Sequence, residues 1–233
     1  NTLAGKTRYV LVVGQSHDLD GVYESGCVIG KNHNISQSPV SPAVFGTGNT
    51  ATTSSHGIMH QGLMFGKSNT TATSGALVGG VSNTAGRAAI NSIVMGSNNE
   101  VGTSGSDYVS ILGGQYNKMT NDTPYSMCYG SYASGNIKGS FEFGGGRHLD
   151  GSGNGIQGSI QLSQFLVGAI TTDATPVILS SKVDDSNTKP PVLSNQSVMF
   201  TAEIVARRGS STESAAYLVT GAIKNDGGTT ALV

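Results

Sequence analysis

A pattern of about sixteen residues recurs along the first two thirds of the chain. Each copy has an apolar residue, one further residue and then a glycine, and in most copies an asparagine or histidine stands three positions after this glycine. The glycines of the nine copies are Gly14, Gly30, Gly46, Gly66, Gly80, Gly96, Gly114, Gly130 and Gly145. Recurrence at a nearly constant spacing predicts stacked structural units of one kind.

The residue two positions before each glycine is expected to face the interior of the stack. It is apolar in every copy: Val12, Val28, Val44, Met64, Val78, Val94, Leu112, Cys128 and Phe143. The competing interpretation is a disordered low-complexity segment rich in glycine, serine and threonine, and it does not predict aligned apolar positions.

The residue three positions after the glycine predicts a tight turn. Asparagine and histidine tolerate a left-handed backbone better than most residues do. The expected turn residues are therefore the first eight repeat glycines, from Gly14 to Gly130, together with Asn49, Asn69, Asn83, Asn99 and Asn117. His17 and His33 take the same place in successive copies, so their side chains are expected to stack.

The length of the repeat favours a narrow all-β fold. Sixteen residues at about 3.3 Å each suffice for two short strands and two turns, so we expect a β-roll or β-helix with one coil every ~4.8 Å. Such a coil is too thin to bury much apolar surface. Its stability must come from stacking and from packing against other chains, and we expect a homotrimer.

The repeat ends near Gly158, which divides the chain into an expected β-roll shaft of residues 1–158 and an antiparallel, sandwich-like β-domain of residues 159–233. Alternating apolar and polar residues typical of half-buried strands occur in the second part. The expected strands are Phe165–Ile170, Pro176–Leu179, Val198–Ala206 and Tyr217–Ile223. A further strand begins at Thr229, so we expect the domain to continue beyond Val233 in a longer chain.

Composition excludes several classes of protein. Glycine makes up 34 of 233 residues and charged residues only 12%, which is atypical of helical enzymes and of disordered chains. The formal net charge of −1 offers no basic surface for nucleic acid. No apolar run approaches the roughly 20 residues of a membrane helix.

Candidate catalytic and metal-binding residues are few, and we expect no catalytic residues, cofactor or metal site. Asp18 and Asp20 are more typical of turn residues than of a glycosidase pair. His17 and His33 replace the turn asparagine, and His56 and His60 fall in the longest repeat, where solvation is favoured over metal binding. Cys27 and Cys128 are six repeats apart, roughly 29 Å along the stack, which is beyond the reach of a disulfide.

Five of the eight tyrosines lie within 25 positions: Tyr108, Tyr116, Tyr125, Tyr129 and Tyr132. Tyrosines serve both as anchors between chains and as contacts for sugars. We favour packing between chains or on the surface over glycan recognition, and the candidates for contact with a glycan or receptor are Tyr108, Tyr116, Tyr125 and Tyr132. Tyr116 and Tyr132 both follow a repeat glycine by two positions, so their rings should stack.

Two groups of proteins resemble this sequence. Repeats such as Ser92–Gly102 and Ser110–Asn117 resemble the β-roll heads of trimeric autotransporter adhesins and the Gly-x-x-Asn shafts of bacteriophage tail fibres and tailspikes. The segments Phe165–Pro176, Phe200–Arg208 and Ala215–Lys224 are similar to a terminal β-domain of phage tail fibres.

The resemblance implies a structural, non-enzymatic part of a tail fibre or spike, present in the extracellular virion as a homotrimer. It implies other tail proteins and a host surface glycan or outer-membrane receptor as partners, with no nucleic acid and no membrane insertion. The alternatives are the head of a bacterial trimeric adhesin and, with less support, a glycan-degrading tailspike.

Overall fold

The computed structural model describes residues 1–4, 9–20, 25–36, 42–52, 62–87, 89–104, 106–120, 123–149, 155–170, 179, 192, 196–207 and 213–233. These residues form strands and turns without any helix, and so none that could cross a membrane, which confirms the all-β prediction. The chain divides into two units, Asn1–Lys189 and Pro190–Val233, which are described separately.

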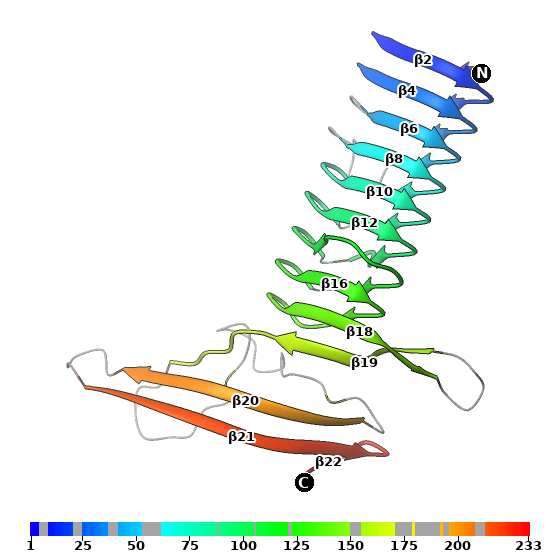
Figure 1. The fold of residues 1–233 in the computed structure, drawn as a ribbon. Helices are drawn as coiled ribbons and strands as arrows, with labels where there is room; N and C mark the ends of the chain where they lie inside the picture. The colour runs from blue at the N-terminus through cyan, green and yellow to red at the C-terminus, as the bar shows by residue number, and fades with distance from the viewer. Residues whose placement is uncertain are drawn as a thin grey trace. The chain divides into compact units, whose positions relative to one another are not determined.

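The first unit is a stack of coils in which each coil adds one strand to each of two parallel sheets (Figure 1). The larger sheet contains β2 (Val10–Gln15), β4 (Gly26–Lys31), β6 (Ala43–Thr47), β8 (Leu63–Lys67), β10 (Leu77–Val81), β12 (Ile93–Ser97), β14 (Ser110–Ile111), β16 (Met127–Ser131) and β18 (Phe141–Leu149), followed by the antiparallel β19 (Gly155–Gln164). The smaller sheet contains β1 (Thr2–Ala4), β3 (Asp18–Asp20), β5 (Asn34–Ser36), β7 (Thr50–Ala51), β9 (Thr70–Thr71), β11 (Thr84–Ala85), β13 (Glu100–Val101), β15 (Lys118–Met119) and β17 (Ser134–Gly135). Of the two short strands predicted for each coil, the one in the larger sheet has five or six residues in most coils and the one in the smaller sheet only two or three.

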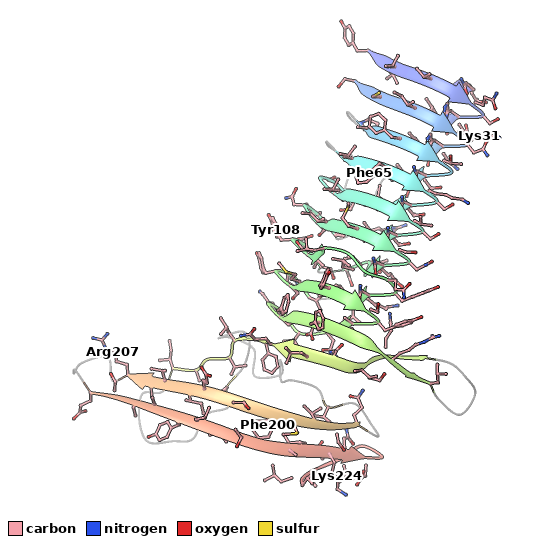
Figure 2. The ribbon with its side chains drawn as sticks, in the orientation of Figure 1. Lys31, Phe65, Tyr108, Phe200, Arg207 and Lys224 are labelled. Carbon is pink, nitrogen blue, oxygen red and sulfur yellow. The ribbon has the colours of Figure 1, made fainter. Side chains whose placement is uncertain are left out.

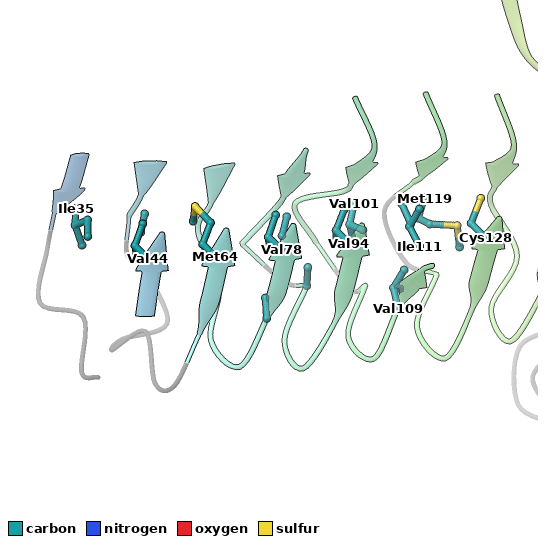
Figure 3. Close-up of a cluster of buried hydrophobic side chains, with 14 of the residues drawn as sticks. Ile35, Val44, Met64, Val78, Val94, Val101, Val109, Ile111, Met119 and Cys128 are labelled. Carbon is teal, nitrogen blue, oxygen red and sulfur yellow. The ribbon is translucent and has the colours of Figure 1, made fainter. Parts of the chain in front are cut away.

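A single file of side chains from each sheet fills the interior (Figure 3). The larger sheet contributes the predicted inward residues Val28, Val44, Met64, Val78, Val94 and Cys128, all of them buried. The smaller sheet contributes residues such as Ile35, Val101 and Met119. The interior therefore has the thickness of two side chains, as the short repeat predicts.

Two of the predicted inward residues are wrong. Ile111 pairs with Val94 and is buried, whereas Leu112 is 48% exposed. This copy has two residues between the inward side chain and the glycine, where the others have one, so counting back from the glycine selects the wrong residue.

In the last copy, Glu142 takes the inward place and Phe143 is 42% exposed. Gly144 pairs with Gly130 in the sheet, so the ninth repeat glycine is Gly144, and Gly145 lies one position beyond it. The nearly constant spacing did not separate these adjacent glycines. The interior file consequently ends on a carboxyl group.

The second unit is a three-stranded antiparallel sheet of β20 (Gln196–Arg207), β21 (Ser214–Asp226) and β22 (Thr229–Leu232). It contains the expected strands over Val198–Ala206 and Tyr217–Ile223. The expected strand over Phe165–Ile170 is wrong: this segment forms only an isolated bridge, and its apolar side chains such as Leu166 are exposed rather than packed. The other expected strand, Pro176–Leu179, lies outside the described residues except for Leu179.

The expected domain boundary after residue 158 falls within β19, which pairs with β18 in the sheet of the first unit.

Candidate binding surfaces

A ladder of buried asparagine side chains joins the coils on one edge of the stack. The Oδ1 atom of each asparagine accepts the backbone N–H of the next ladder residue, as in Asn83 N to Asn69 Oδ1 (3.0 Å) and Asn99 N to Asn83 Oδ1 (3.0 Å). The Nδ2 atom of Asn83 donates to the carbonyls of Gly79 (2.7 Å) and Gly96 (2.8 Å). The same bonds recur at Asn49, Asn69, Asn99 and Asn117.

The predicted left-handed backbone does not occur at these asparagines. It lies one residue earlier, where φ is between 54° and 63° in Ser16, Asn32, Gly48, Ser68, Ser82, Asn98, Tyr116 and Tyr132. The asparagines adjoin the turn but are needed for the hydrogen bonds of their amides inside the stack. The sequence therefore identified the structurally important asparagines, but the left-handed backbone predicted for them is wrong.

The eight repeat glycines from Gly14 to Gly130 all have φ between 82° and 136°. A Cβ atom placed on any of them would overlap the carbonyl oxygen of the repeat glycine in the next coil. Glycine is therefore required here both for its backbone conformation and for the close approach of successive coils.

His33 continues the ladder at its N-terminal end, and His17 takes the same place one coil earlier, where its Nδ1 has no hydrogen-bond partner among the described residues. Their rings stack with centroids 5.1 Å apart, as predicted. The Nδ1 atom of His33 accepts the backbone N–H of Asn49 (3.2 Å), so the ring proton lies on Nε2, 3.2 Å from the carbonyl of Ile29. Burial lowers the pKa of His33, and the neighbouring His17 acts in the same direction.

The outer surface of the larger sheet is apolar along its length. Two residues of each strand face outwards, one on either side of the inward residue. The first column runs Leu11, Cys27, Ala43, Leu63, Leu77, Ile93, Ser110, Met127 and Phe141, and the second runs Val13, Ile29, Phe45, Phe65, Gly79 and Met95, with Tyr129 and Phe143 further along (Figure 2). We call these residues the apolar outer face. These two columns carry no charged residue, but the last residues of the same strands form a third exposed column beside them, which includes Lys31 and Lys67.

The outer surface of the smaller sheet is polar. Its paired residues are Asp18, Asn34, Thr50, Thr70, Thr84, Glu100, Lys118 and Ser134. Lys118 forms an ion pair with Glu100 at 3.1 Å. The stack of coils is therefore amphipathic, with one apolar and one polar broad side.

The four candidate tyrosines form two columns at opposite ends of the strands of the larger sheet. Tyr108 and Tyr125 stack before β14 and β16 with centroids 5.4 Å apart, and Lys138 Nζ lies 5.4 Å from the Tyr125 ring. Tyr116 and Tyr132 stack after these strands at 4.9 Å, which confirms the predicted stacking.

The guanidinium of Arg147 lies 4.5 Å from the ring of Tyr132. Each column thus consists of two tyrosines and one cation, and the fifth tyrosine, Tyr129, packs against Phe143 on the outer face between the columns.

All four column tyrosines have a left-handed backbone, with φ between 56° and 60°. Bulky residues rarely adopt this conformation, and residues held in it concentrate at functional sites. Other coils use Gly75, Asn91 or Gly139 at the place of Tyr108 and Tyr125, so the fold does not require an aromatic residue there. The tyrosines are therefore candidates for a role in binding.

The C-terminal end of the coiled stack contains a buried carboxyl group. Glu142 is 1% exposed, its Oε2 accepts a hydrogen bond from Gln161 Nε2 (3.1 Å), and its Oε1 is buried without a hydrogen-bond partner. Burial raises the pKa of Glu142. Burial, with the Glu142 charge in second place, raises the pKa of the Cys128 thiol to about 12.

Gln161 also completes the edge of the smaller sheet. Its Oε1 accepts the backbone N–H of Ser134 (2.8 Å), and its Nε2 donates to the carbonyl of Ser134 (3.2 Å). One side-chain amide thereby takes the place of a neighbouring strand beside β17 and protects this edge from pairing with another chain. The sequence offered no signal for this contact, because the two residues are 27 positions apart.

The structure brings together no conventional catalytic or metal-binding set among its described residues. Asp18 and Asp20 are exposed on β3, and Cys27 and Cys128 are free thiols. No group of three histidine, cysteine or acidic side chains could hold a metal ion in the part of the chain that the structure describes. His56 and His60 lie outside the described residues.

Comparison with models of protein families, with curated proteins and with solved structures finds no match to this chain.

Proposed function

We propose that this chain is a structural and attachment segment of a bacteriophage tail fibre or spike that works as a homotrimer. In this proposal the first unit is a stiff shaft joined to other tail proteins in the virion. Its exposed side chains contribute to contact with the host surface, and three copies in one particle raise the avidity of individually weak contacts.

The observation that carries the proposal is the apolar outer face. Its side chains are half-buried or exposed although they belong to the largest sheet of the molecule, and the exposed ones include Leu11 (55%), Val13 (49%) and Leu63 (38%). The smaller sheet, by contrast, presents polar residues to solvent. Apolar residues confined to one broad side of the stack of coils indicate that this side is covered by protein.

The size of the face supports the same conclusion. Nine parallel strands at ~4.8 Å spacing and about 15 Å of strand give a flat area of roughly 570 Å². This lies within the 300–600 Å² or so of the largest apolar patch on a typical monomer, and a patch of this size is often functional. The absence of charge from the face means that copies can pack on one another through it without burying an unpaired ion.

The tyrosine columns are the surface to which we assign the contact with the host. In each column one tyrosine ring stacks on the other, and a cation lies over the second ring. A ligand would therefore contact mainly the ring edges and the hydroxyl groups. A guanidinium that lies over a ring keeps its N–H groups directed outwards, in the geometry that binds a carboxylate. These features favour a hydroxyl-rich acidic saccharide over nucleic acid, which needs free ring faces for stacking.

Assembly can be tested with two matched pairs of substitutions. Leu63→Lys with Ile93→Lys places charges on the apolar outer face, and Thr70→Lys with Thr84→Lys places the same charges on the polar side. We expect sedimentation to show a trimer for the wild type and the polar-side variant, and smaller species for the outer-face variant. A monomeric wild-type protein would contradict the proposal.

Attachment can be tested by incubating the fluorescently labelled protein with a panel of bacterial strains. Tyr116→Ser with Tyr132→Ser should reduce binding, whereas Tyr9→Ser should not, since Tyr9 is equally left-handed (φ 54°) and 90% exposed but lacks a stacked partner among the described residues. Binding to animal cells instead of bacteria would favour the adhesin head. Release of reducing ends from capsule would favour the glycan-degrading spike.

A further inference from the structure

The three strands of the second unit separate apolar from charged residues completely. In the antiparallel register Phe200 is opposite Gly221, Ile204 is opposite Tyr217, and Ile223 is opposite Leu232. Directly opposed residues lie on the same face of a sheet. The face that these pairs define has the polar Gln196, Asn225 and Thr230 at one end. Its other residues are Val198, Phe200, Ala202, Ile204, Ala206, Ala215, Tyr217, Val219, Gly221, Ile223 and Leu232, and we call them the C-terminal apolar face.

The opposite face carries every charged residue of these strands: Glu203, Arg207, Lys224 and Asp226 (Figure 2). Lys224 and Asp226 form an ion pair on that face. This face also has apolar members, among them Met199 opposite Ala222 and Val205 opposite Ala216, and they alternate along the strands with polar and charged residues. The distribution is that of a sheet with one solvated and one covered side.

Among the described residues of this unit, however, no second layer covers the C-terminal apolar face. Tyr217 is 59% exposed, Leu232 78% and Val219 43%. Only one end is closed, where Asn225 Nδ2 donates to the carbonyl of Val192 (2.7 Å). A single sheet with one apolar side needs a second layer to bury it.

We propose that this second layer is supplied by the same face of the other copies of the chain in the trimer, which makes the C-terminal unit a self-association element in its own right. A face without charges meets its own copy without burying an unpaired ion. Large side chains alternate with small ones, as Phe200, whose ring lies across Gly221, does with Ala202, so two copies can interdigitate as packed sheets do.

The area of the C-terminal apolar face fits this assignment. Twelve residues of strand at about 3.4 Å and a width of about 12 Å give roughly 490 Å² for one copy. Two facing copies then bury about 1,000 Å², which is the size from which specific interfaces become stable. The element thus adds a contact between copies that is separate from the apolar outer face of the first unit.

Full-length variants test this inference by sedimentation over a dilution series. Phe200→Gln with Ile204→Gln should weaken self-association tenfold or more, because each change places a polar group in the proposed interface. Met199→Gln with Val205→Gln, on the opposite face of the same strand, should leave it unchanged. Equal effects of the two pairs would overturn the proposal.

Oxidative cross-linking gives a second readout that does not depend on stability. In a Cys27→Ser background, Ala202→Cys lies on the C-terminal apolar face and Thr201→Cys on the opposite face. Linked pairs of chains should form with Ala202→Cys and not with Thr201→Cys. If neither variant cross-links, the face is covered by the chain itself and the inference fails.

This inference uses the second copy invoked in the proposed function, but the two can fail separately. Cross-linking through Ala202→Cys that persists when Leu63→Lys and Ile93→Lys are also present would show the C-terminal contact without the shaft contact. Loss of the trimer in the shaft variant, with no cross-linking through Ala202→Cys in the otherwise unchanged chain, would show the reverse.

Discussion

The backbone N–H of Asn99 donates to Oδ1 of Asn83 in the preceding coil at 3.0 Å, and this contact repeats from coil to coil along the stack. The amide of Asn83 also donates to the carbonyls of Gly79 in its own coil and Gly96 in the next coil, and to Oδ1 of Asn69 in the preceding coil (3.2 Å), so one side chain joins three coils. The asparagine side chains themselves are buried. The ladder therefore binds the stack together at the edge where the backbone turns.

Replacement of Asn83 by alanine should lower the free energy of unfolding by about 2–4 kcal/mol. The substitution leaves the N–H of Asn99 and the carbonyls of Gly79 and Gly96 without these bonds, and each buried group left unpaired costs about 1–3 kcal/mol, partly recovered by relaxation. Urea denaturation measures the change. Asn34→Ala, at an exposed position of β5, is the control and should change stability by less than about 0.5 kcal/mol; equal losses would contradict the ladder.

Gly96→Ala should destabilise the protein far more than Gly139→Ala. Both glycines have a positive φ, but a Cβ on Gly96 would overlap the carbonyl of Gly114, whereas nothing lies within 4 Å of a Cβ on Gly139. We expect about 1–2 kcal/mol for Gly139→Ala from backbone strain alone, and a loss of soluble folded protein for Gly96→Ala. Thermal unfolding of the two variants checks the order.

The protein should lose stability as the pH falls below about 6.5, because of His33. Its pKa is lowered in the folded state, so the unfolded chain takes up a proton first and acid favours unfolding. Protonation of Nδ1 also removes the acceptor for Asn49. His33→Asn supplies the amide used elsewhere in the ladder and should flatten this part of the pH profile, measured as melting temperature from pH 8 to pH 5; identical profiles would exclude His33 as the cause.

Glu142 should have the opposite pH dependence. Its pKa is raised in the folded state, so its contribution to stability is most favourable below pH 4.5 and declines as the pH rises through the folded pKa. Glu142→Gln keeps the shape of the side chain without its charge. We expect the variant to be more stable than the wild type at pH 8 and to lose this advantage at pH 4; a constant difference would indicate that ionisation of Glu142 has no effect.

Replacement of Tyr125 by glycine should change stability by less than about 1 kcal/mol. Relief of the left-handed backbone gains about 1 kcal/mol, and loss of the contact with Tyr108 removes a similar amount. Tyr129→Gly, in the extended strand β16, lacks this relief and should cost about 1–3 kcal/mol. A large loss for Tyr125→Gly would mean that the tyrosine columns serve the fold and would weaken their assignment to binding.

Much of the fold could be predicted from the repeat because a coil of fixed length allows few geometries. The spacing of Gly80 and Gly96 gives the number of residues in one coil. The residues two positions before them, Val78 and Val94, must then face inwards. The stacking of His17 on His33 and of Tyr116 on Tyr132 follows in the same way, since equivalent positions of successive coils lie about 5 Å apart.

The tyrosine columns and the apolar outer face could be predicted less well from the repeat. Pairs such as Tyr108 with Tyr125 share a place in the repeat, but the cations that cover the columns, Lys138 and Arg147, come from coils whose pattern is irregular. The outer face could not be recognised until the direction of each strand residue was known. Counting back from the glycine also failed where one extra residue precedes Gly114 and where Gly145 was taken in place of Gly144.

The sequence by itself determined that the chain forms thin, stacked β-coils, because the glycine positions exclude any side chain and the apolar positions recur in step with them. Only the tertiary structure decided that Ile111 and Glu142 face inwards, that the asparagines serve through buried amides, and that Gln161 closes the sheet edge. These depend on which atoms meet between coils, and a one-residue shift along a strand exchanges its two faces without changing its composition.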